Sequence, residues 1–183
     1  PVMANRYAAV CSSFLQFAFE RGHVDSNPAR GLRRYKEKPA TRCLSEPELT
    51  TLAAALDEFR GHPDVVLYVK IALATMARSG EIEGMTSKEI DGDTWLITGD
   101  RTKNGKDHLF FLPPELSIEL SRKPKPMEAT SEQVRQVLTR ISKKENIEHF
   151  SNHDLRRTSS TILAKLGVDT ETRARLLGHS ISG

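Results

Sequence analysis

The chain has 183 residues, of which 38% are hydrophobic and 28% are charged, with a formal net charge of +3. This balance is typical of a soluble globular protein with room for one sizeable core and part of a second domain, and no apolar run is long enough to cross a bilayer. Two cysteines without a secretory signal indicate reduced thiols and a cytoplasmic location rather than a disulfide-stabilised secreted protein. Because the sequence begins at Pro1 rather than at a methionine, we expect it to be a piece of a longer protein.

The first predicted helix covers residues 4–21. Apolar side chains recur along one broad face of it, Gly22 ends it, and Ser26-Asn27-Pro28 is a turn signal. The apolar face consists of Tyr7, Val10, Cys11, Phe14, Leu15, Ala18 and Phe19. A single helix cannot bury such a face alone, so residues 1–29 are predicted to be the last helix of a domain, with Cys11 packed in its core.

Basic charge is concentrated at the start of the chain. Residues 1–44 carry eight Lys/Arg and three Asp/Glu, a balance of +5, whereas the remainder has a balance of −2. A short basic run is more often a solvated linker, but it can also track a DNA backbone and release counterions. We predict an interdomain linker over residues 30–44. Its predicted contacts to the DNA backbone are Arg30, Arg33, Arg34, Lys36 and Lys38.

The main domain is predicted to cover residues 45–183 and to begin with a capped helix. Ser45 is the N-cap, Glu48 completes a capping box and Pro47 is tolerated in the first turn of a helix that runs to about Phe59. A second helix, over residues 64–77, is apolar on nearly all sides and is therefore predicted to be central to the core.

The middle of the chain changes character. After a short helical turn, residues 89–91, 94–97 and 108–112 are predicted to be strands, and Asn104-Gly105 is a strong hairpin signal. Later helices are predicted from Pro113-Pro114 onward, over residues 131–144, around His153, and over residues 170–177. The predicted fold class is mainly α with a small three-stranded antiparallel sheet (α+β), since such a sheet is too small to be stable alone.

Residues suited to chemistry on a phosphodiester occur at four places. Arg78 ends the central helix, Lys103 begins the hairpin turn, His153 and Arg156 share a helix face because they are three apart, and His179 follows the last helix. Histidine exchanges protons near neutral pH, and arginine forks onto phosphate oxygens. Each residue alone is more often an ordinary surface or loop residue, so the hypothesis depends on the ordered set.

This ordered set resembles the tyrosine recombinases, the phage integrase family. The matching motifs are Arg78 followed by Gly80-Glu81, the Thr102-Lys103 hairpin, the segment His153-Asp154-Leu155-Arg156-Arg157, and Leu176-Leu177-Gly178-His179-Ser180. The resemblance covers residues 45–183 as the catalytic domain and makes residues 1–29 the last helix of a core-binding domain. It implies the tyrosine-recombinase catalytic-domain fold and site-specific DNA recombination (integrase), by transesterification through a 3′-phosphotyrosine, in a prophage or mobile element.

The resemblance also assigns roles to residues. Arg78 and Arg156 would stabilise charge on the non-bridging oxygens. Lys103 would protonate the leaving oxygen, and His153 would accept the tyrosine proton or support that transfer. His179 would hydrogen-bond a non-bridging oxygen.

Further expectations concern Glu81 and the partners. Glu81 would orient the neighbouring groups rather than take part in the chemistry. No metal or other cofactor is expected, since two arginines can neutralise phosphate charge. The implied partner is double-stranded DNA with a specific recombination site, bound by a homotetramer of the full protein, whereas this chain alone is expected to be a monomer that associates with no membrane.

The chain departs from the family pattern in its nucleophile. Its tyrosines are Tyr7, Tyr35 and Tyr68, which all precede Arg78 or lie in unsuitable elements. The catalytic tyrosine is therefore expected after Gly183, and this chain is expected to be inactive alone.

Two alternatives remain at this point. A non-catalytic DNA-binding module of the same fold, or a type IB topoisomerase with similar chemistry, would share these motifs. A zinc site is not expected: His149 and His153 are four apart, but a helix cap at Ser151 or Asn152 would leave His149 outside the helix, and no paired cysteines supply further ligands. Arg157 cannot share the face of Arg156, so we expect it to form a salt bridge or a remote phosphate contact.

Overall fold

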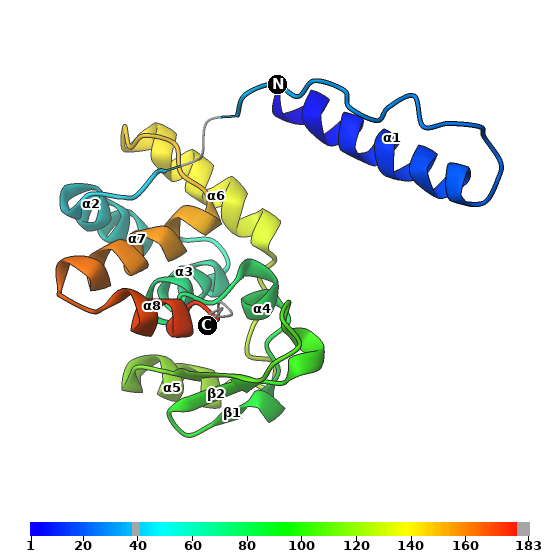
Figure 1. Ribbon diagram of the computed structural model, residues 1–183. Coiled ribbons are helices and arrows are strands. Elements are labelled where there is room, and N and C mark those ends of the chain that lie inside the picture. Colours follow the sequence, from blue (N-terminus) through cyan, green and yellow to red (C-terminus); the bar gives the residue numbers. More distant parts are fainter. Residues whose placement is uncertain (38–40, 179–183) are drawn as a thin grey trace. The chain divides into compact units, whose positions relative to one another are not determined.

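The computed structural model describes residues 1–37 and 41–178 and divides the chain into two compact units, Pro1–Thr41 and Arg42–Gly183 (Figure 1). Each unit is described by itself below. No helix in the described ranges combines the length and the apolar character needed to cross a membrane.

The first unit is one helix with a returning irregular segment. Helix α1 spans Val2–Glu20, close to the predicted range. The segment after it is pinned at Asn5, whose Nδ2 donates to the Tyr35 carbonyl oxygen and whose Oδ1 accepts from the Tyr35 N–H, each at 2.8 Å. The buried residues of α1 are Asn5 and Ala18. The prediction that Cys11 packs in a core is therefore wrong for this unit, because Cys11 and most of the apolar face are exposed.

The second unit is mainly helical, as predicted. Its described helices are α2 (Glu46–Asp57), α3 (Pro63–Thr75), α4 (Ser79–Glu83), α5 (Pro114–Ser121), α6 (Ser131–Lys144), α7 (Asn152–Lys165) and α8 (Thr170–Leu176). Its strands are β1 (Ile90–Asp91), β2 (Thr94–Ile97) and β3 (His108–Phe111), and short 3-10 turns occupy η1 (Ser87–Glu89) and η2 (Gly99–Arg101). The strands form one antiparallel sheet in the order β1-β2-β3, which confirms the predicted fold class.

The sheet has one buried and one exposed face. Trp95 lies opposite Phe110 in the β2–β3 pair and both are buried, whereas the neighbouring pair Leu96 and Leu109 is exposed. This alternation is what a period of two residues requires when one face covers a core. The two strands are not joined by a tight Asn-Gly turn, because β2 ends at Ile97 and β3 begins at His108, and Asn104-Gly105 lies inside the longer loop between them.

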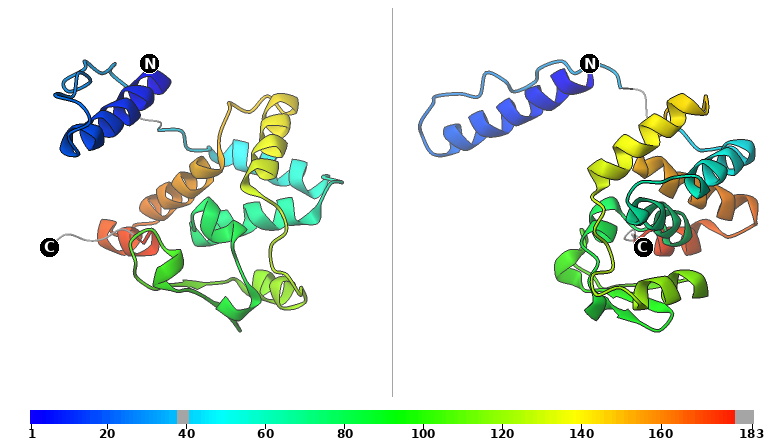
Figure 2. Two further views of the ribbon diagram at one scale, coloured as in Figure 1. Left: turned by 90° about the vertical axis from the view of Figure 1, so that its right-hand side faces the viewer. Right: turned by 180° about the vertical axis from the view of Figure 1, so that it is seen from behind.

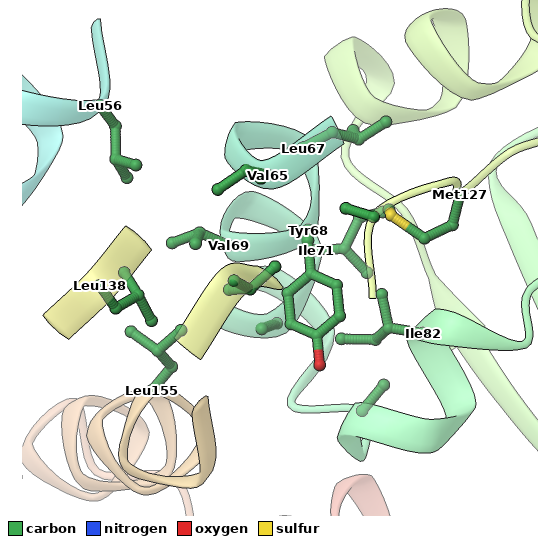
Figure 3. Packing of buried hydrophobic residues seen from close by; sticks show 14 of the residues in the cluster. Leu56, Val65, Leu67, Tyr68, Val69, Ile71, Ile82, Met127, Leu138 and Leu155 are labelled. Carbon is green, nitrogen blue, oxygen red and sulfur yellow. The ribbon is translucent and has the colours of Figure 1, made fainter. Parts of the chain in front are cut away.

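Helix α3 lies at the centre of the core, as its nearly continuous apolar sequence predicts. It contacts α4, α5, α6 and α7. Figure 3 shows its side chains Val65, Tyr68, Val69 and Ile71 surrounded by residues from neighbouring elements. Around this centre, the sheet and α5 lie together at one end of the unit and α2, α6 and α7 at the other (Figures 1 and 2). Because α3 packs against α7, its C-terminal end, which leads to Arg78, is held close to α7.

Candidate active site

One open pocket of about 410 Å³ joins three segments that are far apart in the sequence. They are the turn that leads into α4, the β2–β3 loop and the first turn of α7. The lining residues are Ala77, Arg78, Ser79, Gly80, Lys103, Asn152, His153 and Arg156. Four of the five predicted catalytic residues thus border a single pocket, and the fifth, His179, lies outside the described residues.

A sharp backbone turn presents Arg78 to this pocket. After α3 the chain passes through Met76 in a left-handed conformation with φ of 57°, and the Ala77 N–H donates to Thr75 Oγ1 at 3.1 Å. Buried Glu81 then accepts from the Arg78 N–H through one carboxylate oxygen and from Arg78 Nη1 through the other, each at 2.7 Å. One carboxylate therefore holds both the backbone and the guanidinium of Arg78.

Arg156 reaches the same pocket from α7 and is almost fully buried. Its Nη1 donates to the Met76 carbonyl oxygen, and its Nη2 donates to the Leu177 carbonyl oxygen at 2.5 Å. Burial, followed by the positive charge of Arg78, lowers the pKa of Arg156 to about 10, so the guanidinium stays protonated at neutral pH. Two such cations held side by side favour binding of an anion between them.

The start of α7 positions His153. Ser151 is the N-cap, and both its N–H and its hydroxyl donate to Asp154, at 2.9 and 2.7 Å. Partial burial and then the charges of Arg157 and Arg156 lower the pKa of His153, which keeps its imidazole neutral and able to accept a proton. Arg157 itself forms a salt bridge to Asp154 at 2.7 Å, which is the first of the two contacts expected for it.

Lys103 enters the pocket from the β2–β3 loop, where it is exposed. The loop is closed by the Thr102 hydroxyl, which donates to the Lys106 carbonyl oxygen at 2.8 Å, and by a close approach of Gly99 to Gly105. A Cβ at Gly99 would lie 2.5 Å from the Gly105 carbonyl oxygen, so only glycine fits there. Contacts within the loop thus close its base, and the exposed Lys103 borders the pocket from it.

Sequence reasoning missed His108, which also lies at this site. Its ring is tilted against Phe110 at 4.0 Å between centroids, and a Cβ on Gly178 would come within 2.8 Å of its Nδ1. Burial is the main cause that lowers the pKa of His108, with Arg156 and Arg78 adding to it against Glu81. The period of the strand could have revealed it, because His108 is two residues before buried Phe110 and shares its face.

The remaining predicted site residues lie elsewhere or outside the described residues. Arg30, Arg33, Arg34 and Lys36 are exposed in the first unit, and Lys38 lies outside the described residues. His149 precedes the N-cap of α7, as expected, and across residues 1–37 and 41–178 no group of three or more His, Cys, Asp or Glu side chains could hold a metal ion.

Comparison with known proteins identifies relatives of this chain. The model of the phage integrase family matches residues 114–182. Tyrosine recombinase XerA of Saccharolobus solfataricus is 29% identical over 120 residues, covering 62% of this chain and 41% of that protein. Tyrosine recombinase XerC of Corynebacterium glutamicum is 27% identical over 198 residues, covering 97% of this chain and 64% of that protein. The chain therefore spans less than two thirds of the length of these relatives.

Solved structures agree with this result. The catalytic domain of bacteriophage HP1 integrase superposes with a TM-score of 0.63 at 27% identity, covering 76% of this chain and 81% of that one. A lambda integrase dimer bound to a COC′ core site superposes with a TM-score of 0.78 at 17% identity, covering 98% of this chain and 56% of that one. The fold is thus that of tyrosine recombinase catalytic domains, and the sequence is similar to tyrosine recombinases and, over residues 114–182, to the phage integrase family.

Proposed function

We propose that this protein is a site-specific DNA recombinase that cuts and rejoins double-stranded DNA through a 3′-phosphotyrosine intermediate. The observation that carries the proposal is the joint lining of one pocket by Arg78, Lys103, His153 and Arg156. The likeness to a lambda integrase dimer bound to its core site supports DNA as the partner. Because the chain spans only part of its relatives, the activity is proposed for the whole protein.

The chemistry follows from the charges that develop at phosphorus. A tyrosine oxygen forms a bond to phosphorus while the bond from phosphorus to the 5′-oxygen breaks, so negative charge grows on the non-bridging oxygens. The guanidiniums of Arg78 and Arg156 are already fixed by Glu81, Met76 and Leu177, and they stabilise that charge without reorganising. Energy of the broken bond is kept in the phosphotyrosine, which the 5′-hydroxyl attacks in the reverse step.

Proton transfers complete the step. Neutral His153 takes the proton of the attacking tyrosine hydroxyl, and Lys103 gives a proton to the leaving 5′-oxygen. The nucleophile is a tyrosine that follows Gly183 in the full protein. Tyr68 cannot serve, because it is completely buried.

The proposal extends to partners. The exposed basic residues Arg30, Arg33, Arg34 and Lys36 contact the DNA backbone without reading its sequence. The full protein assembles as a tetramer on paired sites, a proposal supported by the likeness to a lambda integrase tetramer bound to a Holliday junction, and this chain is a monomer without DNA.

The test is formation of a covalent protein–DNA adduct by the protein extended through the residues that follow Gly183 in its gene. We expect an adduct that resists denaturation on duplexes selected by their binding, and we expect Arg156→Ala to abolish the adduct while DNA binding stays within a few fold. Absence of any adduct with retained binding would support the non-catalytic module instead. Relaxation of supercoiled DNA without site preference would support the topoisomerase.

A further inference from the structure

Among the described residues, two buried polar atoms without hydrogen-bond partners belong to Tyr68 and to Asn152, and Asn152 lines the pocket. Tyr68 is completely buried in α3, and its hydroxyl has no hydrogen-bond partner of good geometry among the described residues. Asn152 Oδ1, at the start of α7, is also buried and unpartnered in the same described part of the chain. A buried tyrosine hydroxyl normally finds a partner, since an unpaired one is costly compared with phenylalanine.

The two atoms belong to one small cluster. Figure 3 shows the phenol oxygen of Tyr68 pointing away from Val65 and Leu67. Burial raises the pKa of Tyr68, and the polar side chains of Ser79 and Asn152 oppose this rise. Ser79 and Asn152 both line the pocket.

The pocket has two halves, the turn that carries Arg78 and the first turn of α7, which carries His153. Ser79 directly follows Arg78, and Asn152 directly precedes His153. Asn152 is already held on one side, because its Nδ2 donates to the Ser131 carbonyl oxygen at 2.8 Å, which leaves Oδ1 as its free acceptor. A hydroxyl donor at Tyr68 would fix the remaining freedom of the Asn152 amide and, with it, the first turn of α7.

We propose that Tyr68 is a positioning residue whose hydroxyl donates to Asn152 Oδ1 and accepts from the Ser79 hydroxyl, directly or through one buried water. It thereby fixes the distance between the Arg78 turn and the His153 turn on either side of the bound phosphate. The catalytic part of this inference rests on the proposed recombinase function, whereas the anion-binding part does not.

The anion-binding part is tested on this chain with inorganic phosphate, followed through the ring resonances of His153 by NMR. We expect Tyr68→Phe to weaken phosphate binding by at least about threefold, because the two halves of the pocket lose their fixed separation. The matched control is Tyr7→Phe, which removes the same atom from an exposed ring of α1 and should change nothing. Equal phosphate affinity in the wild type and in Tyr68→Phe would overturn the inference.

The catalytic part is tested by single-turnover cleavage in the extended protein. Tyr68→Phe and Asn152→Ala should each slow cleavage roughly tenfold at saturating DNA, with DNA affinity within about twofold of wild type. If the hydroxyl acts through Asn152, the double variant is no slower than the slower single variant. If the rate losses of the two single variants multiply in the double variant, or if DNA affinity falls as much as the cleavage rate, the role of Tyr68 is merely structural.

The outcomes separate the two proposals. A wild-type protein that forms no adduct contradicts the proposed function, while the phosphate titration still decides the role of Tyr68. A wild-type protein that cleaves, together with a Tyr68→Phe variant that cleaves at the same rate, contradicts the role of Tyr68 alone. Should Tyr68→Phe fail to fold in thermal melting, Asn152→Ala tests the same contact from the pocket side.

Discussion

Glu81→Gln tests how much the buried carboxylate that holds Arg78 contributes to the stability of the protein. In the wild type both Glu81 oxygens accept, one from the Arg78 N–H and one from Arg78 Nη1, each at 2.7 Å. Glutamine keeps the size but replaces one acceptor by an NH₂ donor, which then faces a donor on Arg78. The variant therefore loses one hydrogen bond to a charged group and leaves the repulsion between Arg78 and Arg156 without its nearest counter-charge.

The magnitude follows from the burial of the pair. The Glu81 side chain is 5% exposed and that of Arg78 is 29% exposed, so solvent screens the bond only in part. A hydrogen bond to a charged group contributes about 1.5–3 kcal/mol. In a chain of this length about 1 kcal/mol changes the Tm by about 2–4 °C, so we expect a Tm roughly 3–12 °C lower.

Thermal unfolding followed by circular dichroism measures this change. The control is Glu132→Gln, which alters another i,i+3 pair with arginine, at Arg135, where both side chains are more than half exposed. Because exposed pairs contribute little, this control should melt close to the wild type. A Glu81→Gln variant that melts like the wild type, or a control that falls equally far, would refute the reasoning.

Two further predictions concern salt and pH. Replacing Arg30, Arg33, Arg34 and Lys36 together by glutamine should reduce the slope of log affinity against log salt by about 0.9 for each DNA phosphate that is no longer neutralised, and an unchanged slope would remove these residues from the DNA surface. Burial lowers the pKa of His108 in the folded state, so the unfolded state binds more protons below about pH 6.5 and stability falls as the pH drops through that value. His108→Gln should make the Tm less dependent on pH between about 5 and 7, and parallel melting profiles for variant and wild type would contradict this assignment.

Local signals in the sequence were sufficient to predict most elements. Helix α6 spans the predicted residues 131–144 because a Thr130 cap and a strongly amphipathic pattern define it, and α2 begins after the predicted cap at Ser45. The end of α3 was less visible. It lies at Thr75 because Met76 takes a left-handed conformation, and a methionine gives no signal for that.

Some residues of the candidate site could be predicted from the sequence, and others could not. Arg78, Lys103, His153 and Arg156 could be selected because their types and order form a motif, although nothing local says that they meet. The period of β3 places His108 on the buried face with Phe110, but its position beside Arg78 and Arg156 arises only from tertiary packing. The unpartnered atoms of Tyr68 and Asn152 likewise have no local signal in the sequence. Cys11 shows the converse error, since an apolar periodicity indicates a face that can be buried but not what covers it.

The measurement that tests the central claim most directly is cleavage of a DNA site whose leaving 5′-oxygen is replaced by sulfur. A thiolate leaves without needing a proton, whereas charge still grows on the non-bridging oxygens. Lys103→Ala should therefore cleave the sulfur-containing site nearly as fast as the wild type, while Arg156→Ala should remain about 10²–10³-fold slower. Rescue of both variants, or of neither, would contradict the proposal that this pocket acts on one phosphodiester with separate roles for its lysine and its arginines.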